Sequence, residues 1–278
     1  MSASAWAAVS PCTEACVTDD RPAAGAGVGR AVTGRRYAAF VATLAGAAAA
    51  GKRLGEGEEL RRRARTLLAD LDVSLRCDTE RLSAPAPDGR TGTLVVANHI
   101  SWLDALALLA VQPATLLAKR EVGQWPVIGE LVRRAGTRFI DRDGLRGLPD
   151  TVRELGALLR SGESVVVFPE GTTWCSAPGG PFRRATFQAA IDAGAPVRPV
   201  TLSYECDGAP STLPAYVGDG SFVASFRRVA AARGLSVRVT PHPALLPAGH
   251  DRRSLAALAY AAVSGPDPAS GARSEGAR

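Results

Sequence analysis

A histidine and an aspartate near the middle of the chain have the types and spacing of an acid–base pair. His99 follows the apolar run 93–97 and Asn98, and Asp104 comes five residues after it. A neutral imidazole can accept a proton near physiological pH, and a carboxylate can orient it. Five residues correspond to about 140° on a continuous helix, so the two side chains would then diverge. We therefore expect His99 in a turn and Asp104 in the first turn of the helix that follows.

Ser101 lies between these two residues and has two interpretations. It forms a Ser-x-x-Asp sequence with Asp104, which is typical of a helix N-terminus, and we therefore expect Ser101 to be an N-cap rather than a nucleophile. Asp104 itself is either the partner of His99 or only a helix-start carboxylate that the helix dipole favours. The neighbouring His99 favours the first interpretation.

The elements that must position these residues alternate along the chain. Apolar, strand-like runs occupy residues 93–97, 115–118, 137–140, 164–168, 197–204 and 235–240. Helix-like runs occupy residues 103–111, 126–135, 149–160, 183–193, 221–233 and 252–263. Strands that alternate with helices predict an α/β fold with a largely parallel sheet covered by helices.

Further polar residues follow other predicted strands. Arg142 comes after the strand 137–140, and the sequence Glu170-Gly171-Thr172 comes after the strand 164–168. Parallel strands bring their carboxyl ends to one edge of the sheet. We therefore expect His99, Arg142 and Glu170 to line one cleft.

Taken in order, these segments resemble the sequence blocks of the glycerolipid acyltransferase family. The blocks are Asn98-His99-x4-Asp104, Gly136-x-x-Phe139-Ile140-Asp141-Arg142, Phe168-Pro169-Glu170-Gly171-Thr172 and Val197-x-Pro199-Val200. Lys119-x-Glu121 and Pro126-x-x-Gly129 resemble the 1-acyl-sn-glycerol-3-phosphate acyltransferase branch. The resemblance covers roughly residues 70–245, and the order of the blocks makes it specific.

The resemblance implies a membrane-associated O-acyltransferase that needs no metal or organic cofactor. In such an enzyme His99 is the general base and Asp104 orients it, while the acyl group passes from acyl-CoA or acyl-carrier protein to the sn-2 hydroxyl of 1-acyl-glycerol-3-phosphate. The residues implied to bind the acceptor are Arg142, Lys119, Glu170, Gly171 and Thr172, with Arg142 as the main phosphate ligand. The product would be phosphatidic acid.

The overall charge fits an anionic partner. The 278 residues carry a net charge of +6, with a pI near 9.4, and 5% of them are aromatic. Nucleic acid is disfavoured because no aromatic residues are interleaved with a basic run. An anionic membrane surface and a lysophospholipid acceptor both fit the charge.

The region before the sheet suggests attachment to a membrane. Residues 37–50 are uncharged, and as a helix they would span about 21 Å, too short to cross the hydrocarbon core. Residues 60–71 place a leucine stripe beside several arginines, which is typical of an interfacial helix and also of an ordinary docked helix with a solvated face. We expect a peripheral or half-inserted protein at the cytoplasmic face of the cell membrane.

These patterns divide the chain into four parts. Residues 1–30 are expected to be disordered, residues 31–72 to form the membrane-associating helical segment, residues 73–263 to form the catalytic domain, and residues 264–278 to form a disordered tail.

The sequence is also compatible with other acceptors and with a second class of protein. The acceptor could instead be lyso-ornithine lipid, another lyso-lipid or another alcohol, because the blocks themselves do not discriminate between acceptors. A non-catalytic, basic membrane-binding protein is the alternative from another class. The five cysteines match no zinc or redox spacing, and we interpret them as reduced thiols.

Overall fold

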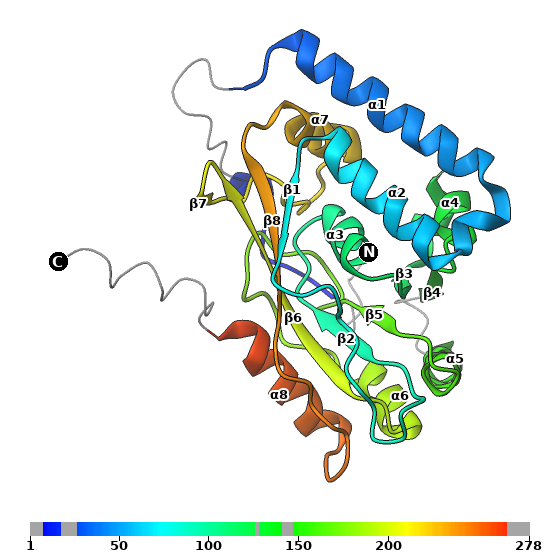
Figure 1. The fold of residues 1–278 in the computed structure, drawn as a ribbon. Coiled ribbons are helices and arrows are strands. Elements are labelled where there is room, and N and C mark those ends of the chain that lie inside the picture. Colours follow the sequence, from blue (N-terminus) through cyan, green and yellow to red (C-terminus); the bar gives the residue numbers. More distant parts are fainter. Residues whose placement is uncertain (1–7, 18–26, 126–127, 141–146, 266–278) are drawn as a thin grey trace.

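A single mixed sheet of eight strands forms the centre of the protein (Figure 1). The computed structural model describes residues 8–17, 27–125, 128–140 and 147–265. The strands are β1 (Ser74–Cys77), β2 (Leu94–Ala97), β3 (Thr115–Lys119), β4 (Arg138–Ile140), β5 (Val165–Val167), β6 (Val197–Cys206), β7 (Ala209–Pro210) and β8 (Leu235–Pro241).

The strand order places the expected chemistry at adjacent strand ends. The order is β1-β8-β6-β2-β5-β3-β4, with β7 paired to β6. All pairs are parallel except β6 with β8 and β6 with β7, so the prediction of a largely parallel sheet is confirmed. Because β2 lies between β5 and β6, the residues after β2 and β5 are neighbours.

Two of the strands were not predicted. In β1 the side chains are alternately exposed and half-buried and include Arg76, so no apolar pattern marks the strand. The strand β7 consists of Ala209–Pro210 alone and pairs with the end of β6. Both owe their conformation to a neighbouring strand rather than to their own residues.

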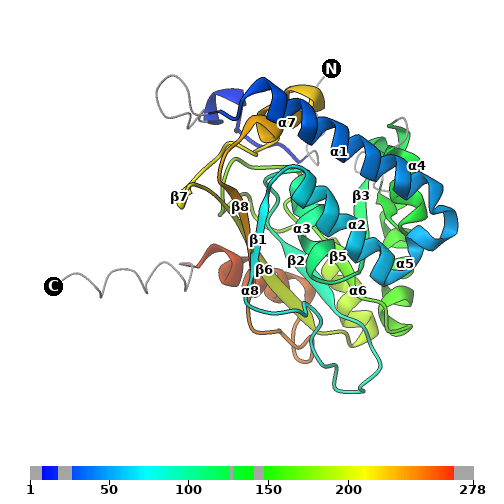
Figure 2. The same ribbon diagram turned by 45° about the horizontal axis from the view of Figure 1, so that its top comes forward.

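Helices cover both faces of the sheet (Figures 1 and 2). They are α1 (Arg30–Ala49), α2 (Gly57–Asp70), α3 (Leu103–Val111), α4 (Ile128–Arg134), α5 (Leu148–Arg160), α6 (Ala185–Ala193), α7 (Phe222–Ala231) and α8 (Arg252–Ser264), with 3-10 helices η1 (Glu14–Cys16), η2 (Gly51–Gly55) and η3 (Arg120–Gln124). Helices α1, α2, α3 and α7 pack on one face, and α5, α6 and α8 on the other.

Alternating side chains of the buried strands supply the two cores. In β2, Val95 and Ala97 belong to the core beneath α2 and α3, whereas Leu94 and Val96 belong to the core beneath α5 and α6. All four side chains are essentially inaccessible to solvent. The continuous apolar run that predicted the strand therefore reflects burial on both faces, as is usual for parallel sheets.

Helix α2 uses its leucine stripe for internal packing. Leu60, Leu67 and Leu68 are buried in the core shared with α1 and α3. Away from this core, Glu59 pairs with both Arg62 and Arg63. The structure therefore gives α2 a docked apolar face and an outer face whose positive charge is partly neutralised.

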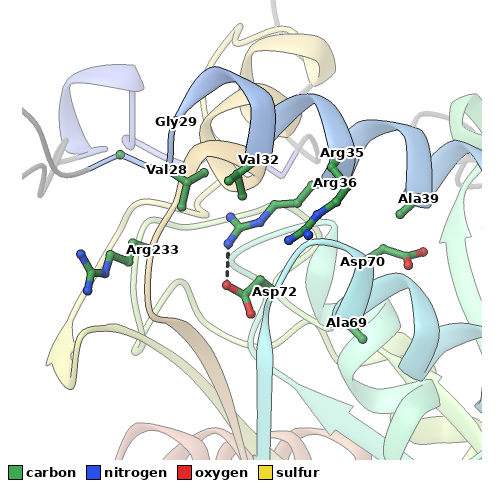
Figure 3. Close-up of a pocket in the computed structure, with 11 residues that line it drawn as sticks. Val28, Gly29, Val32, Arg35, Arg36, Ala39, Ala69, Asp70, Asp72 and Arg233 are labelled. Atoms are coloured by element: carbon green, nitrogen blue, oxygen red, sulfur yellow. Dashed lines mark hydrogen bonds and ion pairs between the residues drawn. The ribbon is translucent and has the colours of Figure 1, made fainter.

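Helix α1 is longer than the uncharged run that predicted it, and a buried arginine attaches it. Arg36 donates hydrogen bonds to the carbonyl oxygens of Ala230 and Ala232, at 3.0 and 2.6 Å, and pairs with Asp72 at 2.5 Å (Figure 3). An open hollow of about 620 Å³ adjoins this contact. Within the described residues, no helix combines the length and hydrophobicity that crossing a bilayer requires.

The expected boundaries at the two ends of the chain stay predictions. Within residues 1–30, the stretch 8–17 includes η1 and packs against the rest of the protein, since Thr212 Oγ1 donates a hydrogen bond to the carbonyl oxygen of Cys16 at 2.9 Å. Residues 1–7, 18–26 and 266–278 lie outside the described residues. The division at residue 72 coincides with no break in packing, because α1 and α2 share a core with the sheet, and the division at residue 263 falls within α8.

Candidate active site

The turn that carries the histidine begins with a side chain that makes two hydrogen bonds from the end of β2 to β6. The buried side chain of Asn98 donates a hydrogen bond to the carbonyl oxygen of Leu202 at 3.0 Å and accepts one from the amide of Leu202 at 2.7 Å. This pair of bonds imitates a backbone ladder contact just beyond the last residue of β2. It fixes the point where the chain leaves the sheet and turns toward α3.

His99 and Asp104 lie in contact. His99 Nδ1 is 2.8 Å from Asp104 Oδ2, the His99 side chain is 20% exposed, and the Asp104 side chain is fully buried. His99 lies in the turn and Asp104 in the first turn of α3, which is the expected arrangement. Because a carboxylate only accepts hydrogen bonds, the proton of a neutral imidazole lies on Nδ1, and Nε2 keeps its lone pair.

Three further donors hold the Asp104 carboxylate. The amides of Ile100 and Ser101 donate to Oδ2 at 2.6 and 2.9 Å, and the hydroxyl of Tyr204 donates to Oδ1 at 2.6 Å. A buried carboxylate is tolerated only when such bonds replace its hydration. The helix-start interpretation and the His99-partner interpretation of Asp104 therefore both hold.

The structure corrects the expected N-cap. Helix α3 begins at Leu103 and its N-cap residue is Trp102, not Ser101. Ser101 is fully buried, and its hydroxyl accepts a hydrogen bond from the amide of Leu103 at 3.3 Å. Ser101 still stabilises the turn before the helix, because its amide donates to Asp104 Oδ2 and its carbonyl oxygen accepts the Asp104 amide.

No sequence pattern indicated that the hydroxyl of Tyr204 belongs to the site. Tyr204 lies on β6, and its buried hydroxyl donates to Asp104 from 100 residues further along the chain. Burial and the charge of Asp104 raise the pKa of Tyr204 well above its usual value, so the hydroxyl remains a donor. A tyrosine in an apolar strand requires a polar partner, but the sequence alone does not show which one.

Phe168 and Glu170, after β5, support His99 from the neighbouring strand. The Phe168 ring stacks on the His99 ring, with centroids 4.1 Å apart and an interplanar angle of 16°. Glu170 Oε2 accepts a hydrogen bond from the His99 amide at 2.7 Å. The amide of Trp174 donates to the carbonyl oxygen of His99 at 2.8 Å. The loop 168–174 therefore binds both backbone groups of His99 and also fixes the plane of its ring.

Similarity to known proteins agrees with this geometry. Residues 76–203 match the acyltransferase family. A 1-acyl-sn-glycerol-3-phosphate acyltransferase from Neisseria meningitidis is 38% identical over 175 residues, which cover 63% of this chain and 67% of the relative. A lyso-ornithine lipid O-acyltransferase from Pseudomonas aeruginosa is 36% identical over 186 residues, which cover 66% of this chain and 70% of the relative. The aligned regions span about two thirds of each relative.

The chain belongs to the acyltransferase family. It is an enzyme, as the resemblance implied. The crystal structure of the 1-acyl-sn-glycerophosphate acyltransferase PlsC from Thermotoga maritima has the same fold, with a TM-score of 0.59 and 18% sequence identity, covering 84% of this chain and 92% of that chain.

Three of the remaining candidates, Gly171, Thr172 and Lys119, follow or end strands β5 and β3 of this acyltransferase. Gly171 is buried at φ +78°, a conformation that favours glycine, and Thr172 beside it is half-buried. Lys119 ends β3, which pairs with β5; its half-exposed ammonium lies 3.9 Å from the Glu121 carboxylate. Arg142 lies outside the described residues.

The carboxyl group of Glu170 faces inward. Burial raises its pKa to about 8; the hydrogen bond from His99 opposes this rise and the charge of Asp104 adds to it. A side chain on Gly179 would meet Glu170 Oε1 at 2.2 Å, so the glycine allows the loop to close over the carboxyl group. The geometry assigns Glu170 a positioning contact with His99, while its expected contact with an acceptor stays a prediction.

The raised pKa of Glu170 predicts a pH-dependent stability that Glu170→Gln removes. The folded protein retains a proton up to about pH 8, whereas the unfolded chain releases it near 4.5. The free energy of unfolding should therefore fall as the pH rises between these values, by about 2 kcal/mol from pH 6 to pH 8. Urea denaturation at both pH values measures the change, with Glu80→Gln, at an exposed site, as the control. An identical pH dependence in the wild type and Glu170→Gln would contradict the prediction.

Proposed function

We propose that this acyltransferase acylates a lysophospholipid, with 1-acyl-glycerol-3-phosphate as the preferred acceptor and phosphatidic acid as the product. The observation that carries the proposal is the His99–Asp104 pair, 2.8 Å apart at the carboxyl ends of β2 and β5. The acceptor named for the Neisseria meningitidis relative supports the substrate class.

His99 Nε2 removes the proton from the acceptor hydroxyl in the proposed reaction. The hydroxyl oxygen attacks the carbonyl carbon of an acyl thioester, the new ester C–O bond forms, and the C–S bond breaks. The departing thiolate takes the proton back from His99. Between these two steps Asp104 stabilises the imidazolium, because its carboxylate accepts a hydrogen bond from Nδ1. The acyl donor is acyl-CoA or acyl-carrier protein, and no metal or organic cofactor takes part.

The acceptor's phosphate has cationic candidates on the β3 and β4 side of this pair. Lys119 ends β3, and Arg142 follows β4, which pairs with β3. A guanidinium binds a phosphate monoester through two hydrogen bonds, so Arg142 is the main proposed ligand and Lys119 a second one. Gly171 and Thr172 border the same edge and complete the proposed acceptor site.

The outer face of α1 supports peripheral attachment to an anionic membrane. Beyond Arg36 its exposed residues are uncharged: Ala38, Val41, Ala42, Ala45 and Ala49. Val41 is 59% exposed, and the chain carries a net charge of +6. We propose that α1 lies on the cytoplasmic face of the membrane, where both lipid substrate and product reside.

Lyso-ornithine lipid is the second candidate acceptor. The alignment with the Pseudomonas aeruginosa relative is longer than that with the Neisseria meningitidis relative, 186 against 175 residues, at nearly the same identity. Lyso-ornithine lipid lacks a phosphate, so in this case Arg142 would have no phosphate to bind.

A panel of acceptors separates the two candidates. The purified chain is assayed with one labelled acyl-CoA and with 1-acyl-glycerol-3-phosphate, lyso-ornithine lipid and lysophosphatidylcholine. We expect kcat/KM to be at least about tenfold higher for 1-acyl-glycerol-3-phosphate, because a charge-assisted phosphate contact contributes about 1.5–3 kcal/mol. Arg142→Ala should raise the KM of this acceptor. A preference for lyso-ornithine lipid would replace the proposed acceptor, and no transfer to any of them would exclude both.

A further inference from the structure

Three cysteines from distant parts of the chain meet beside the loop that supports His99. The Sγ atoms of Cys12, Cys16 and Cys175 lie within 4.8 Å of one another, and those of Cys12 and Cys175 are 3.3 Å apart. Cys12 lies two residues before η1 and Cys16 is its last residue, whereas Cys175 lies in the loop after β5, next to Trp174. Within the described ranges this is the one group of three or more potential metal ligands.

Backbone hydrogen bonds order the polypeptide around these thiols. The Cys12 amide donates to Ser10 Oγ at 3.1 Å, and the Cys16 amide donates to the carbonyl oxygen of Thr13 at 3.0 Å. The Cys175 amide donates to Cys12 Sγ at 3.4 Å. All three cysteines are half-buried. The first two bonds hold the backbone that carries Cys12 and Cys16, and the third donates directly to a sulfur.

The pKa values of two thiols in the group are shifted in opposite directions. Burial raises the pKa of Cys12, but hydrogen bonds from Ser10 and from the Cys175 amide outweigh it, so that the net pKa is lowered. Burial and the neighbouring Cys12 raise the pKa of Cys175 to about 11.

The number and spacing of the sulfurs favour a metal ion over a disulfide. A disulfide would join two of the sulfurs at about 2.0 Å and leave the third without a role. Tetrahedral Zn²⁺ with Zn–S bonds of about 2.3 Å places its sulfurs about 3.8 Å apart. The three sulfurs all lie within 4.8 Å of one another, with one pair at 3.3 Å, so small movements bring them to this spacing. Three thiolates are soft ligands, which suit zinc rather than magnesium or calcium.

We propose that Cys12, Cys16 and Cys175 bind one zinc ion, with water in the fourth position. The ion is structural, and the proposed acyl transfer does not pass through it. It fastens residues 8–17 to the loop 168–175, where Ala8 already fills the space beside Gly171. Because the Trp174 amide binds the His99 carbonyl oxygen, the same tie stabilises the backbone that holds His99.

Zinc binding by the reduced full chain tests the proposal. The metal-free chain is titrated with ZnCl2 against a competing chelator, and metal content is measured by mass spectrometry after desalting. We expect about one zinc per chain, and we expect Cys16→Ser to raise the dissociation constant at least about tenfold, because even the loss of a residue that only supports a metal ligand costs that much. Cys77→Ser, on β1, is the matched control and should bind zinc as the wild type does.

Two further measurements keep the test independent of the folding of a variant. Cobalt added to the wild type should give the charge-transfer absorption of thiolate coordination, and zinc should slow hydrogen exchange in residues 8–17. Failure of the wild type to retain zinc, or equal affinity in Cys16→Ser, would overturn the proposal. So would a Cys12–Cys175 disulfide in the freshly isolated chain together with no zinc binding after its reduction. None of these results depends on the acceptor.

Discussion

His99→Ala lowers kcat/KM for acyl transfer by about 10²- to 10⁴-fold, the usual contribution of a general base, while the protein stays folded. The reason is that Nδ1 donates a hydrogen bond to Asp104, so Nε2 is the ring nitrogen whose lone pair can accept the proton of the acceptor hydroxyl. The folded state tolerates the change because the His99 side chain is 20% exposed and Asp104 keeps three other donors. Initial rates with a labelled acyl thioester measure the activity, and thermal unfolding measures the fold.

The matched control for this variant is His250→Ala. His250 is exposed in the loop before α8, and its replacement should leave both the rate and the melting temperature unchanged. Wild-type activity in His99→Ala would remove the histidine from the mechanism. A large fall in melting temperature, with a loss of activity that follows it, would assign His99 a structural role instead.

Asp104→Asn lowers kcat by about 10²-fold and has little effect on the acceptor KM. The amide oxygen of asparagine takes the place of Oδ2, because an NH2 group there would face three donors, from His99, Ile100 and Ser101. The amide nitrogen then faces the Tyr204 hydroxyl, which can accept its hydrogen bond. The imidazole keeps its orientation but loses its counter-charge when it is protonated, which costs about 3 kcal/mol.

Tyr204→Phe separates the effect of the charge of Asp104 from the effect of its geometry. It removes one donor to Asp104 and leaves the carboxylate, so the loss of kcat should be about tenfold or less. Steady-state kinetics of the two variants side by side give the answer. If Tyr204→Phe loses as much activity as Asp104→Asn, then the geometry of the carboxylate, and not its charge, limits the rate.

Short-range patterns were sufficient to predict most of the fold and the His99–Asp104 contact. The expected helix 103–111 coincides with α3, and the strand 115–118 is extended by one residue in β3. Burial on both faces produces a continuous apolar run, and buried strands are therefore easy to recognise. His99 and Asp104 are five residues apart, so a turn and one helical turn determine where both side chains lie.

Contacts between distant residues escaped prediction because no local pattern records them. Tyr204 reaches Asp104 only because β6 lies beside β2, and that pairing depends on the whole strand order. The inward orientation of Glu170 depends on Gly179 closing the loop over it. Cys12 and Cys175 are 163 residues apart, and the spacing of the cysteines along the chain gives no sign that they meet.

The distribution of the site over the strands has an evolutionary consequence. His99 and Asp104 occupy one uninterrupted turn, and their supports come from β5 and β6, on either side of β2. Of the proposed phosphate ligands, Lys119 ends β3, which pairs with β5, and Arg142 follows β4 in the sequence. Under the proposed function, substitutions there would change the preferred acceptor without altering the residues that transfer the proton. Relatives named for two different acceptors can thus resemble this chain almost equally, at 38% and 36% identity.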